Sequence, residues 1–269
     1  MGCCASEGTG LQNDRLNDLG KLEKGKDVAM IGAPRDNDAA GRRKKYAGNK
    51  SLVLGYWKMR GLAHPIRYLL EYTEHPYENV MYEQGDSPNF SVESWTSVKN
   101  TLGLDFPSIP YLLDPNTEAK LTDPYAIMLY IATSYAPELL GQTSEQVAEI
   151  DMLYGQLKDV KTAITGPCYV GADRKTLSVT AKEKMKPIVA YLGKKDFLFG
   201  NNLSFLDFYM LEQCEFVQWL TEEEFLSENK AAARFVKRMK NLKQIKRYIK
   251  SDRFLAKPFN NKVAKINNL

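Results

Sequence analysis

The chain has 269 residues and a formal net charge of +4, and its 43% hydrophobic and 26% charged residues are typical of a globular protein, which excludes disorder throughout. No stretch reaches the ~20 consecutive apolar residues of a membrane-spanning helix, and the N-terminus lacks the apolar core of a secretory signal, so we expect a cytosolic protein. The four cysteines, Cys3, Cys4, Cys168 and Cys214, match neither a disulfide framework nor a zinc site, and no metal is predicted.

The first 50 residues are rich in Gly, Asn, Asp, Lys and Arg without a sustained apolar period, which predicts a flexible, disordered tail. The tail begins MGCCAS, the pattern for myristoylation of Gly2, and Cys3 and Cys4 are placed for palmitoylation. One myristoyl chain attaches only marginally, but acylated cysteines or the RRKK cluster at 42–45 supply a second element. We therefore expect an anchored tail, the alternative being an unmodified disordered leader.

The character changes at Ser51. SLVLGYW is a short β-type run, and HPIRYLLEY after it has apolar residues at helical intervals. Further along we predict a strand near 77–82, a short helix near 95–99, strands near 111–113 and 120–121, and a helix at 124–134. This βαβ then ββα order predicts an α/β domain with a mixed sheet over residues 51–135.

Helical periodicity dominates residues 144–269, which predicts a second, all-α domain. Ser204-Phe-Leu-Asp207 has the spacing of a capping box. The aromatic stripe that follows, with Phe205, Phe208 and Phe216, is typical of a buried helix rather than of a ligand site.

Charge is distributed unevenly along the chain. Residues 1–50 carry ten basic and seven acidic side chains, residues 51–229 fourteen and twenty-five, and residues 230–269 thirteen and one. The local balances of +3, −11 and +12 favour an anionic partner surface for the C-terminal region, although a solvated helix face explains the same pattern. Nucleic acid is not expected, because no recognition motif accompanies the charges and only Phe235 and Tyr248 are available for stacking.

Several segments resemble the mu-class glutathione transferases: GYW at 55–57, RGLAHPIR at 60–67, LLEYT at 69–73, LGLDFPSIPYL at 102–112 and SDRFLAKP at 251–258. The resemblance implies a thioredoxin-like N-terminal domain with a four-stranded mixed sheet, followed by an all-helical C-terminal domain. It also implies a homodimer that uses glutathione as co-substrate without a cofactor.

Tyr56 is the predicted catalytic residue. A free thiol has a pKa near ~8.5, so at neutral pH only a small fraction is the nucleophilic thiolate unless a site stabilises the anion. A tyrosine hydroxyl that donates a hydrogen bond to the sulfur provides that stabilisation. In isolation, a tyrosine at a strand end is more often a packing residue, and the Gly-x-Trp context carries the assignment.

The resemblance also implies a glutathione site. Its members are Trp57, Trp95 and Lys99 at the glycine end, and Ser108, Ile109 and Pro110 at the cysteinyl unit, with a cis bond before Pro110. Indole N–H donors and an ammonium complement a carboxylate, and backbone exposed before a cis proline can pair with an extended ligand. The alternatives are core tryptophans, a surface lysine and an ordinary turn.

At the γ-glutamyl end the chain departs from the family, since Asp123 and Pro124 replace residues that normally donate to a carboxylate. Asp123 can accept from the ligand's ammonium, and Asp159 of the partner subunit is expected to reach the same group. The alternative is structural, because Asp is a good N-cap and Pro suits the first turn of a helix.

The predicted electrophile pocket contains Met59, Leu62, Tyr169 and Phe259, with Tyr169 as an acid. Phe106 resembles the aromatic key that inserts into the neighbouring subunit, unless it belongs to the local core.

The sequence therefore predicts a glutathione transferase that conjugates the thiolate to small hydrophobic electrophiles and is anchored to the cytosolic face of a membrane. The alternative is a non-catalytic scaffold or binding module with the transferase fold, because the clamp is altered at Asp123-Pro124. Isomerase or peroxidase reactions use the same thiolate, and the sequence does not separate them.

Overall fold

The structure is a computed structural model that describes residues 50–267 of the chain. The predictions for Gly2, Cys3, Cys4 and the cluster at 42–45 fall outside the described residues. The described residues belong to one compact unit, Asp38–Leu269. Within residues 50–267, no helix is both long and apolar enough to cross a membrane.

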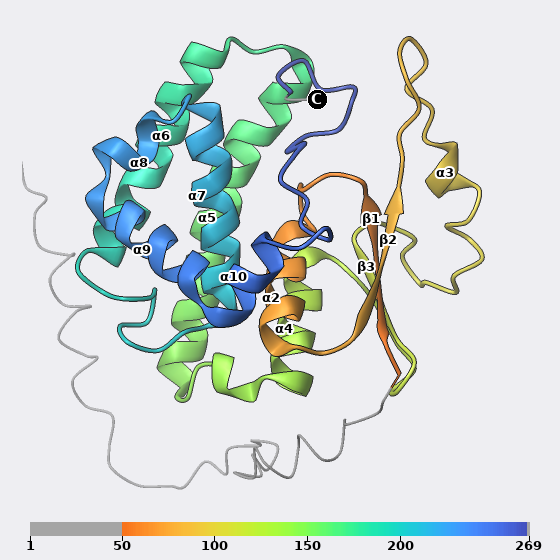
Figure 1. Ribbon diagram of the computed structural model, residues 1–269, viewed down its shortest axis with the longest axis horizontal. Helices are drawn as coiled ribbons and strands as arrows, with labels where there is room; N and C mark the ends of the chain where they lie inside the picture. The colour runs from red at the N-terminus through yellow and green to blue at the C-terminus, as the bar shows by residue number, and fades with distance from the viewer. Residues whose placement is uncertain (1–49, 268–269) are drawn as a thin grey trace, which may run out of the picture. The chain divides into compact units, whose positions relative to one another are not determined.

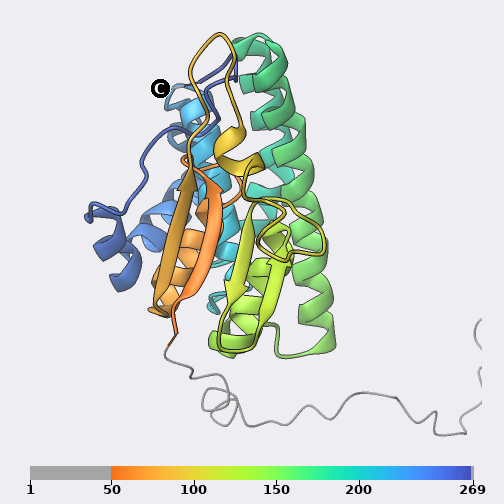
Figure 2. The same cartoon turned by 90° about the vertical axis from the view of Figure 1, so that its right-hand side faces the viewer.

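Four strands form a mixed sheet (Figure 1, Figure 2). They are β1 (Leu52–Trp57), β2 (Tyr77–Tyr82), β3 (Tyr111–Asp114) and β4 (Ala119–Thr122), in the spatial order β2-β1-β3-β4. β2 is parallel to β1, whereas β3 is antiparallel to both β1 and β4. Because β1 is a central strand, Leu52 and Leu54 are fully buried, and the end of β1 is held in the middle of the sheet.

Helices lie on both faces of this sheet. α2 (His64–Thr73) and α4 (Pro124–Tyr135) lie between the sheet and the helical part of the chain, and the short α3 (Glu93–Thr96) lies on the other side (Figure 1). α2 buries Ile66, Leu69 and Leu70 at helical intervals and packs against α4 and α7. The sheet and the helical part consequently share one hydrophobic core.

The remaining elements are helical. They are η2 (Pro137–Leu139), α5 (Ser144–Val170), α6 (Arg174–Leu192), α7 (Phe205–Leu220), α8 (Glu224–Glu228), α9 (Lys230–Asn241) and α10 (Lys243–Ile249). α7 is buried over most of its length and packs on α2, α5, α6 and α9, as its aromatic stripe predicts. The predicted capping box at its start is confirmed, since Asp207 Oδ2 accepts a 2.8 Å hydrogen bond from the Ser204 N–H.

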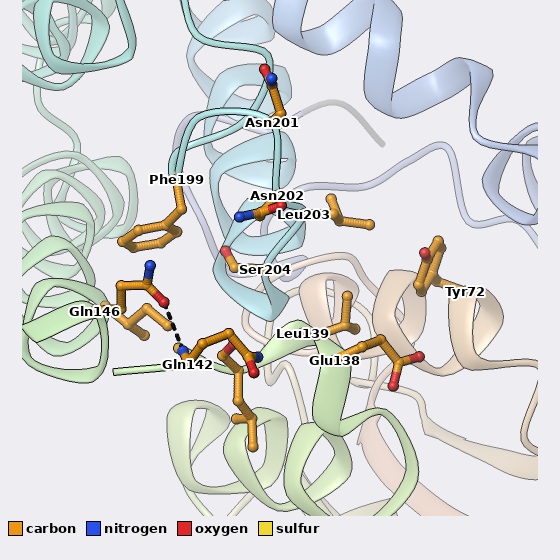
Figure 3. A pocket seen from close by; sticks show the side chains of 13 residues that line it. Tyr72, Glu138, Leu139, Gln142, Gln146, Phe199, Asn201, Asn202, Leu203 and Ser204 are labelled. Atoms are coloured by element: carbon orange, nitrogen blue, oxygen red, sulfur yellow. Dashed lines mark hydrogen bonds between the residues drawn. The ribbon is translucent and has the colours of Figure 1, made fainter. Parts of the chain in front are cut away.

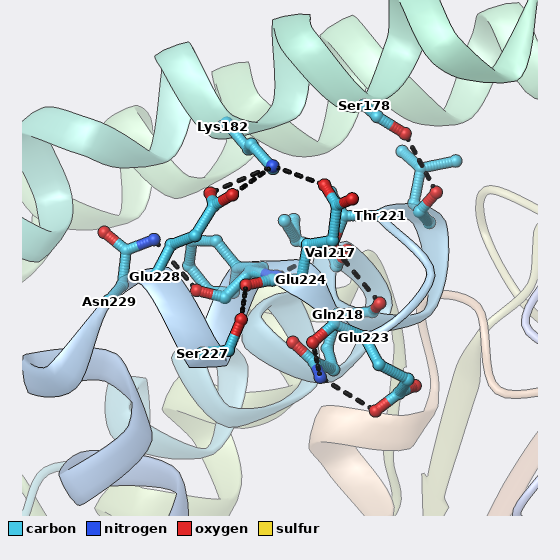
Figure 4. A network of polar contacts seen from close by, with 12 residues as sticks. Ser178, Lys182, Val217, Gln218, Thr221, Glu223, Glu224, Ser227, Glu228 and Asn229 are labelled. Atoms are coloured by element: carbon cyan, nitrogen blue, oxygen red, sulfur yellow. Dashed lines mark hydrogen bonds and ion pairs between the residues drawn. The ribbon is translucent and has the colours of Figure 1, made fainter.

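A polar network ties α6 to α8 (Figure 4). The Lys182 ammonium lies 2.7 Å from Glu224 Oε2 and 2.9 Å from Glu228, so one cation of α6 bridges two carboxylates of α8. Thr221 and Gln218 bind the backbone at the start of α8, which closes the turn after α7.

The predicted fold class is confirmed: a four-stranded mixed sheet of the thioredoxin-like type is followed by an all-helical domain. The short helix predicted near 95–99 covers Glu93–Thr96 instead, because the chain continues from it in turns in which the Val98 and Lys99 amides both bond the Trp95 carbonyl. The two cysteines of the described chain, Cys168 and Cys214, are buried and unpaired with each other.

Candidate active site

Tyr56 lies at the carboxyl end of β1. Its ring has 4% of its surface exposed and packs with Met59, Ala63 and Leu62. The hydroxyl oxygen accepts a hydrogen bond from the Leu62 backbone N–H, with 3.2 Å between the two atoms. Because the amide occupies an acceptor position only, the hydroxyl can still donate its proton. Burial raises the pKa of Tyr56 more than the Leu62 amide lowers it, so the hydroxyl is protonated at neutral pH.

Gly61 lets the loop after β1 lie directly against the Tyr56 ring. Its φ is +48°, in the left-handed region that favours glycine. A Cβ at this position would lie 2.8 Å from Tyr56 Oη and 2.7 Å from Met59 Cε, closer than ordinary van der Waals contact. The position of the Tyr56 hydroxyl therefore depends on a glycine here.

Arg60 anchors the same loop to α7. Its guanidinium pairs with Glu212 and Glu215, and all three side chains are buried. Tyr68 donates a 2.7 Å hydrogen bond to Glu215, and the Lys240 ammonium lies 2.6 Å from the other Glu215 oxygen. Burial disfavours the charge of Arg60, but the two carboxylates outweigh it and raise the pKa of Arg60 above its ordinary value.

Sequence reasoning assigned no role to Arg60. A signal was present, since Arg60 stands in a motif shared with the family, and α7 carries Glu212 and Glu215 three positions apart within its mostly apolar sequence. Buried charges require partners, so the carboxylates of α7 already called for a cation.

The tryptophans predicted for the glycine end of glutathione lie close together. Trp95 is 7% exposed and stacks on Tyr111, with ring centroids 5.9 Å apart and planes at 24°. Trp57 is half-buried and contacts both this cluster and the cluster around Tyr56. Lys99 follows Trp95 by one turn, is half-buried, and has no ion pair with another described residue. The structure thus places all three on one side of the end of β1.

The loop before β3 also meets this site. The Ile109–Pro110 bond is cis, which confirms the prediction. Ile109 is half-buried and packs against both the Tyr56 and the Trp95 clusters, whereas Ser108 is exposed and Pro110 is buried. The backbone of this loop is consequently held next to Tyr56.

Asp123 is the N-cap of α4, and Pro124 takes the first position of that helix. Asp123 Oδ1 accepts hydrogen bonds from the amides of Tyr125 (2.9 Å) and Ala126 (3.1 Å). The structural role expected of both residues is confirmed. The side chain is exposed, and both of these hydrogen bonds engage the same carboxylate oxygen, so a ligand role for Asp123 stays a prediction.

Three of the four residues predicted for the electrophile pocket lie near Tyr56. Met59 is buried against the Tyr56 ring, and Leu62 is half-buried beside it. The Tyr169 phenol, at the end of α5, is near enough to contribute to the raised pKa of Tyr56, after burial, the main cause. Tyr169 Oη accepts a 3.0 Å hydrogen bond from the Asn261 N–H and, like Tyr56, can still donate its own proton.

Phe259 is placed differently from the prediction. Its ring is 6% exposed and stacks on Trp219 of α7, with centroids 5.2 Å apart and planes at 22°. The Arg60 guanidinium carbon lies 4.5 Å from the ring centroid. The amides of Arg60 and Gly61 bind the carbonyls of Pro258 and Phe259, which fixes this part of the chain against the loop after β1. Phe259 therefore belongs to the core and lines none of the cavities described below.

Lys161 of α5 is a buried cation that sequence reasoning missed, because a lysine on a helix is usually at the surface. It is 8% exposed, and its ammonium lies 4.2 Å from the centroid of the Phe216 ring. Burial lowers the pKa of Lys161 to about 8, against an opposing effect of Glu212. With Leu62 and Gln213 it lines a narrow cleft that is too small to admit a water molecule.

The two residues predicted to act between subunits are at the surface. The Phe106 ring is 80% exposed, so the alternative that it belongs to the local core is wrong. Asp159 of α5 is also exposed. An exposed phenylalanine is typical of a contact that another surface covers, and its role in a dimer stays a prediction.

Two wider cavities are present. One of about 220 Å³ lies between the ends of β1 and β2 and the C-terminal segment, and its lining includes Tyr82, Gln84, Pro258 and Asn261. The other, of about 320 Å³, lies near the start of α5 (Figure 3). Its lining combines carboxamide, aromatic and aliphatic side chains, among them Gln142, Asn202, Phe199, Tyr72 and Leu139. None of the predicted site residues lines this larger cavity.

Comparison with known proteins places the chain in a family. Residues 52–133 match the family profile described as glutathione S-transferase, N-terminal domain, and residues 158–252 match that of the C-terminal domain. Glutathione S-transferase Mu 1 of Bos taurus is 38% identical over 216 residues, which cover 79% of this chain and 97% of the relative. The chain belongs to the mu class of the glutathione S-transferase family.

Other relatives agree with this membership. Glutathione S-transferase B of Cavia porcellus is 37% identical and Glutathione S-transferase Mu 4 of Homo sapiens 36% identical, over 81% and 80% of this chain and 99% and 97% of their own lengths. The crystal structure of the glutathione S-transferase Blo t 8 has a TM-score of 0.71 at 23% identity and covers 80% of this chain and 100% of its own, which supports the fold. The family predicted from the sequence is thereby confirmed.

Proposed function

We propose that this glutathione S-transferase joins the sulfur of glutathione to small hydrophobic electrophiles, with Tyr56 as the catalytic residue. The observation that carries the proposal is the state of the Tyr56 hydroxyl, which is protonated and accepts from the Leu62 amide. Such a hydroxyl can donate to a sulfur anion. The three relatives compared above are all glutathione S-transferases, which supports the same reaction.

The chemistry requires glutathione to lose its thiol proton to solvent. The hydrogen bond from Tyr56 then favours the thiolate and lowers the thiol pKa. A sulfur lone pair forms the new bond to the electrophilic carbon, and the displaced electrons leave with the leaving group or reside on the electrophile. Tyr169, which retains a proton to donate, supports that developing charge.

We place the glycine carboxylate of glutathione at Trp57, Trp95 and Lys99, because Lys99 has no carboxylate of the described chain as its partner. Ile109 offers its backbone to the cysteinyl unit. At the other end, Pro124 has no N–H to donate, and the loss of one charge-assisted hydrogen bond corresponds to about ten- to a hundredfold in affinity. Weak glutathione binding is therefore expected, with Asp123 and Asp159 of the partner subunit contributing to the ammonium site.

We further propose a homodimer in which the exposed Phe106 enters the neighbouring subunit. The cytosolic face of a membrane is the proposed location, reached through acylation of Gly2, Cys3 and Cys4. The MGCCAS sequence supports this attachment. Mass spectrometry of the native protein tests it, since an unmodified Gly2 would remove the anchor without affecting the transferase proposal.

Titration of the glutathione thiol in the complex tests the catalytic proposal, with ultraviolet absorbance of the thiolate as the measurement. We expect a thiol pKa below ~8.5 in the complex. Tyr56→Phe should return it to that value and lower kcat/KM on the order of a hundredfold. Tyr191→Phe removes a phenol oxygen from α6, outside the site, and serves as the control.

The competing function is a scaffold with the transferase fold, motivated by the altered clamp at Asp123-Pro124. Retention on immobilised glutathione together with conjugation that depends on Tyr56 excludes it. Failure of both retention and conjugation in the unaltered protein would establish it.

A further inference from the structure

α9 and α10 are amphipathic in the same way. Their buried side chains, packed towards the core, are Ala232, Phe235, Val236 and Met239 of α9 and Ile245 and Tyr248 of α10. At 3.6 residues per turn, Lys230, Arg234 and Lys237 fall within roughly 60° on the opposite side of α9. Lys243, Lys246 and Lys250 fall within roughly 60° on the opposite side of α10 and its C-cap. The two helices contact each other and are adjacent in Figure 1.

Most of the basic side chains in this part of the described chain form no ion pair. Between residues 230 and 253 the chain has ten basic side chains and one acidic side chain. Four of the ten form ion pairs with acidic residues elsewhere in the chain. The pairs are Arg238–Asp196, Lys240–Glu215, Arg247–Glu74 and Arg253–Glu71.

The other six basic side chains are Lys230, Arg234, Lys237, Lys243, Lys246 and Lys250. All six are exposed and make no ion pair with another described residue. Arg234 binds only a backbone carbonyl, that of Gly193. These six residues constitute the basic face, a set of positive charges directed away from the core.

We propose that the basic face binds the anionic leaflet of a membrane and orients the transferase on it. The inference rests on the membrane attachment in the proposed function, and it adds a contact made by the folded domain itself. Anionic lipids attract juxtamembrane basic residues within about a Debye length of the surface. Because a single acyl chain attaches only marginally, a basic surface supplies the second element needed for stable attachment.

The chemistry of the face favours lipid over nucleic acid. Five of its six residues are lysines, which are hydrated point charges suited to a layer of head groups, whereas planar arginine forks suit bidentate recognition. Binding of single-stranded nucleic acid also relies on exposed aromatic rings for stacking. The two aromatic residues of α9 and α10, Phe235 and Tyr248, are each 1% exposed and cannot serve in this way.

The test uses the full chain produced without acylation and sedimented with vesicles. We compare phosphatidylcholine vesicles with vesicles that also contain phosphatidylserine. The face variant is the triple Lys237→Gln, Lys246→Gln, Lys250→Gln, and the matched control is the triple Lys175→Gln, Lys184→Gln, Lys186→Gln. The control removes the same charge from exposed positions of α6.

We expect the unaltered protein to bind only the phosphatidylserine vesicles, less tightly as salt rises. The face variant should lose about a hundredfold in partition coefficient, at about fivefold for each lysine, while the control binds like the unaltered protein. Equal binding of the face variant and the control overturns the proposal. So does the absence of binding by the unaltered protein.

Two further outcomes distinguish this proposal from anchoring through the acylated tail and from binding of nucleic acid. Suppose that Gly2 of the native protein proves to be unacylated and that vesicle binding still depends on the basic face. This result supports the basic face and refutes only the proposed anchoring through the tail. If an RNA or DNA duplex displaces the protein from vesicles, and the face variant loses that duplex binding more than vesicle binding, the face belongs to nucleic acid and the proposal is wrong.

Discussion

The two walls of the candidate active site are built in different ways. The loop after β1 is held from within, where Gly61 lies against the Tyr56 ring and Arg60 is buried between two carboxylates. The C-terminal segment at 260–267 is held by hydrogen bonds and ion pairs to several elements, such as those from the Val263 amide to Gln84 and from Lys262 to Asp86, with Ala264 buried. We therefore expect the loop beside Tyr56 to stay fixed by burial, and the C-terminal segment to open locally at a lower free-energy cost.

The largest expected effect tests the buried network. Arg60→Ala leaves Glu212 and Glu215 in the core without their shared cation, and we expect the free energy of unfolding to fall by about 3–5 kcal/mol. Urea unfolding measures this change. Lys58→Ala removes a nearby cation whose pair with Glu83 is exposed, and it should change stability little. Equal losses in both variants would contradict a wall held by burial.

The next effect is a pH dependence at Lys161. Burial lowers its pKa in the folded protein to about 8 from the ordinary 10.5, so between these values the unfolded chain binds the proton more tightly. The contribution of this group to the free energy of unfolding therefore rises as pH increases from about 8 to about 10.5, by at most about 3 kcal/mol. Lys161→Met should abolish the rise. Urea unfolding of both proteins at several pH values measures how the free energy of unfolding changes with pH. The same pH dependence in the unaltered protein and in Lys161→Met would contradict the prediction.

A smaller effect is expected at Gly61. Gly61→Ala introduces a Cβ at positive φ against Tyr56 Oη and should cost about 1–3 kcal/mol of stability. It should also lower kcat/KM, because the hydroxyl is displaced from the thiolate position. Gly155→Ala is the control, since a Cβ there meets nothing within 4 Å and an alanine inside α5 should stabilise by about 0.5–1 kcal/mol. Unchanged activity in Gly61→Ala would show that the ring position is not set by this contact.

The smallest effect concerns the other wall. Gln84→Ala removes the acceptor of the hydrogen bond from the Val263 amide, in which the two atoms lie 3.1 Å apart. The free energy needed to open the C-terminal segment locally should fall by about 1 kcal/mol. Hydrogen exchange at Val263 should accelerate while the Tm changes little. A large fall in Tm would instead make this segment part of the global core.

The helices, the strands and the buried residues beside the site could be predicted from the sequence, because local patterns determine them. The β-type run at 51–57, the helical spacing of α2 and the capping box of α7 depend on neighbours in the chain. The roles of Arg60 and Lys161 depend on α7, and Arg60 is 152 positions from Glu212. No periodicity reports such a contact, nor the stacking of Phe259 on Trp219.

The ligand roles of Trp57, Trp95, Lys99 and Asp123 came from the resemblance alone. The structure brings Trp57 and Trp95 together beside the end of β1, with Lys99 one turn after Trp95, but spacing in the sequence carries no information on which of them meets glutathione. Asp123 illustrates the difficulty, because its capping bonds are explained fully by helix geometry.

The two sulfhydryl groups of the described chain bear on how such an enzyme survives its own chemistry. Cys168 and Cys214 are both inaccessible to solvent, and burial raises the pKa of each, so neither offers a reactive sulfur anion at neutral pH. Compounds that alkylate thiols consequently find no reactive cysteine thiolate in residues 50–267. Under the proposed function, the folded domain is thereby protected from alkylation of its own thiols by its electrophilic substrates.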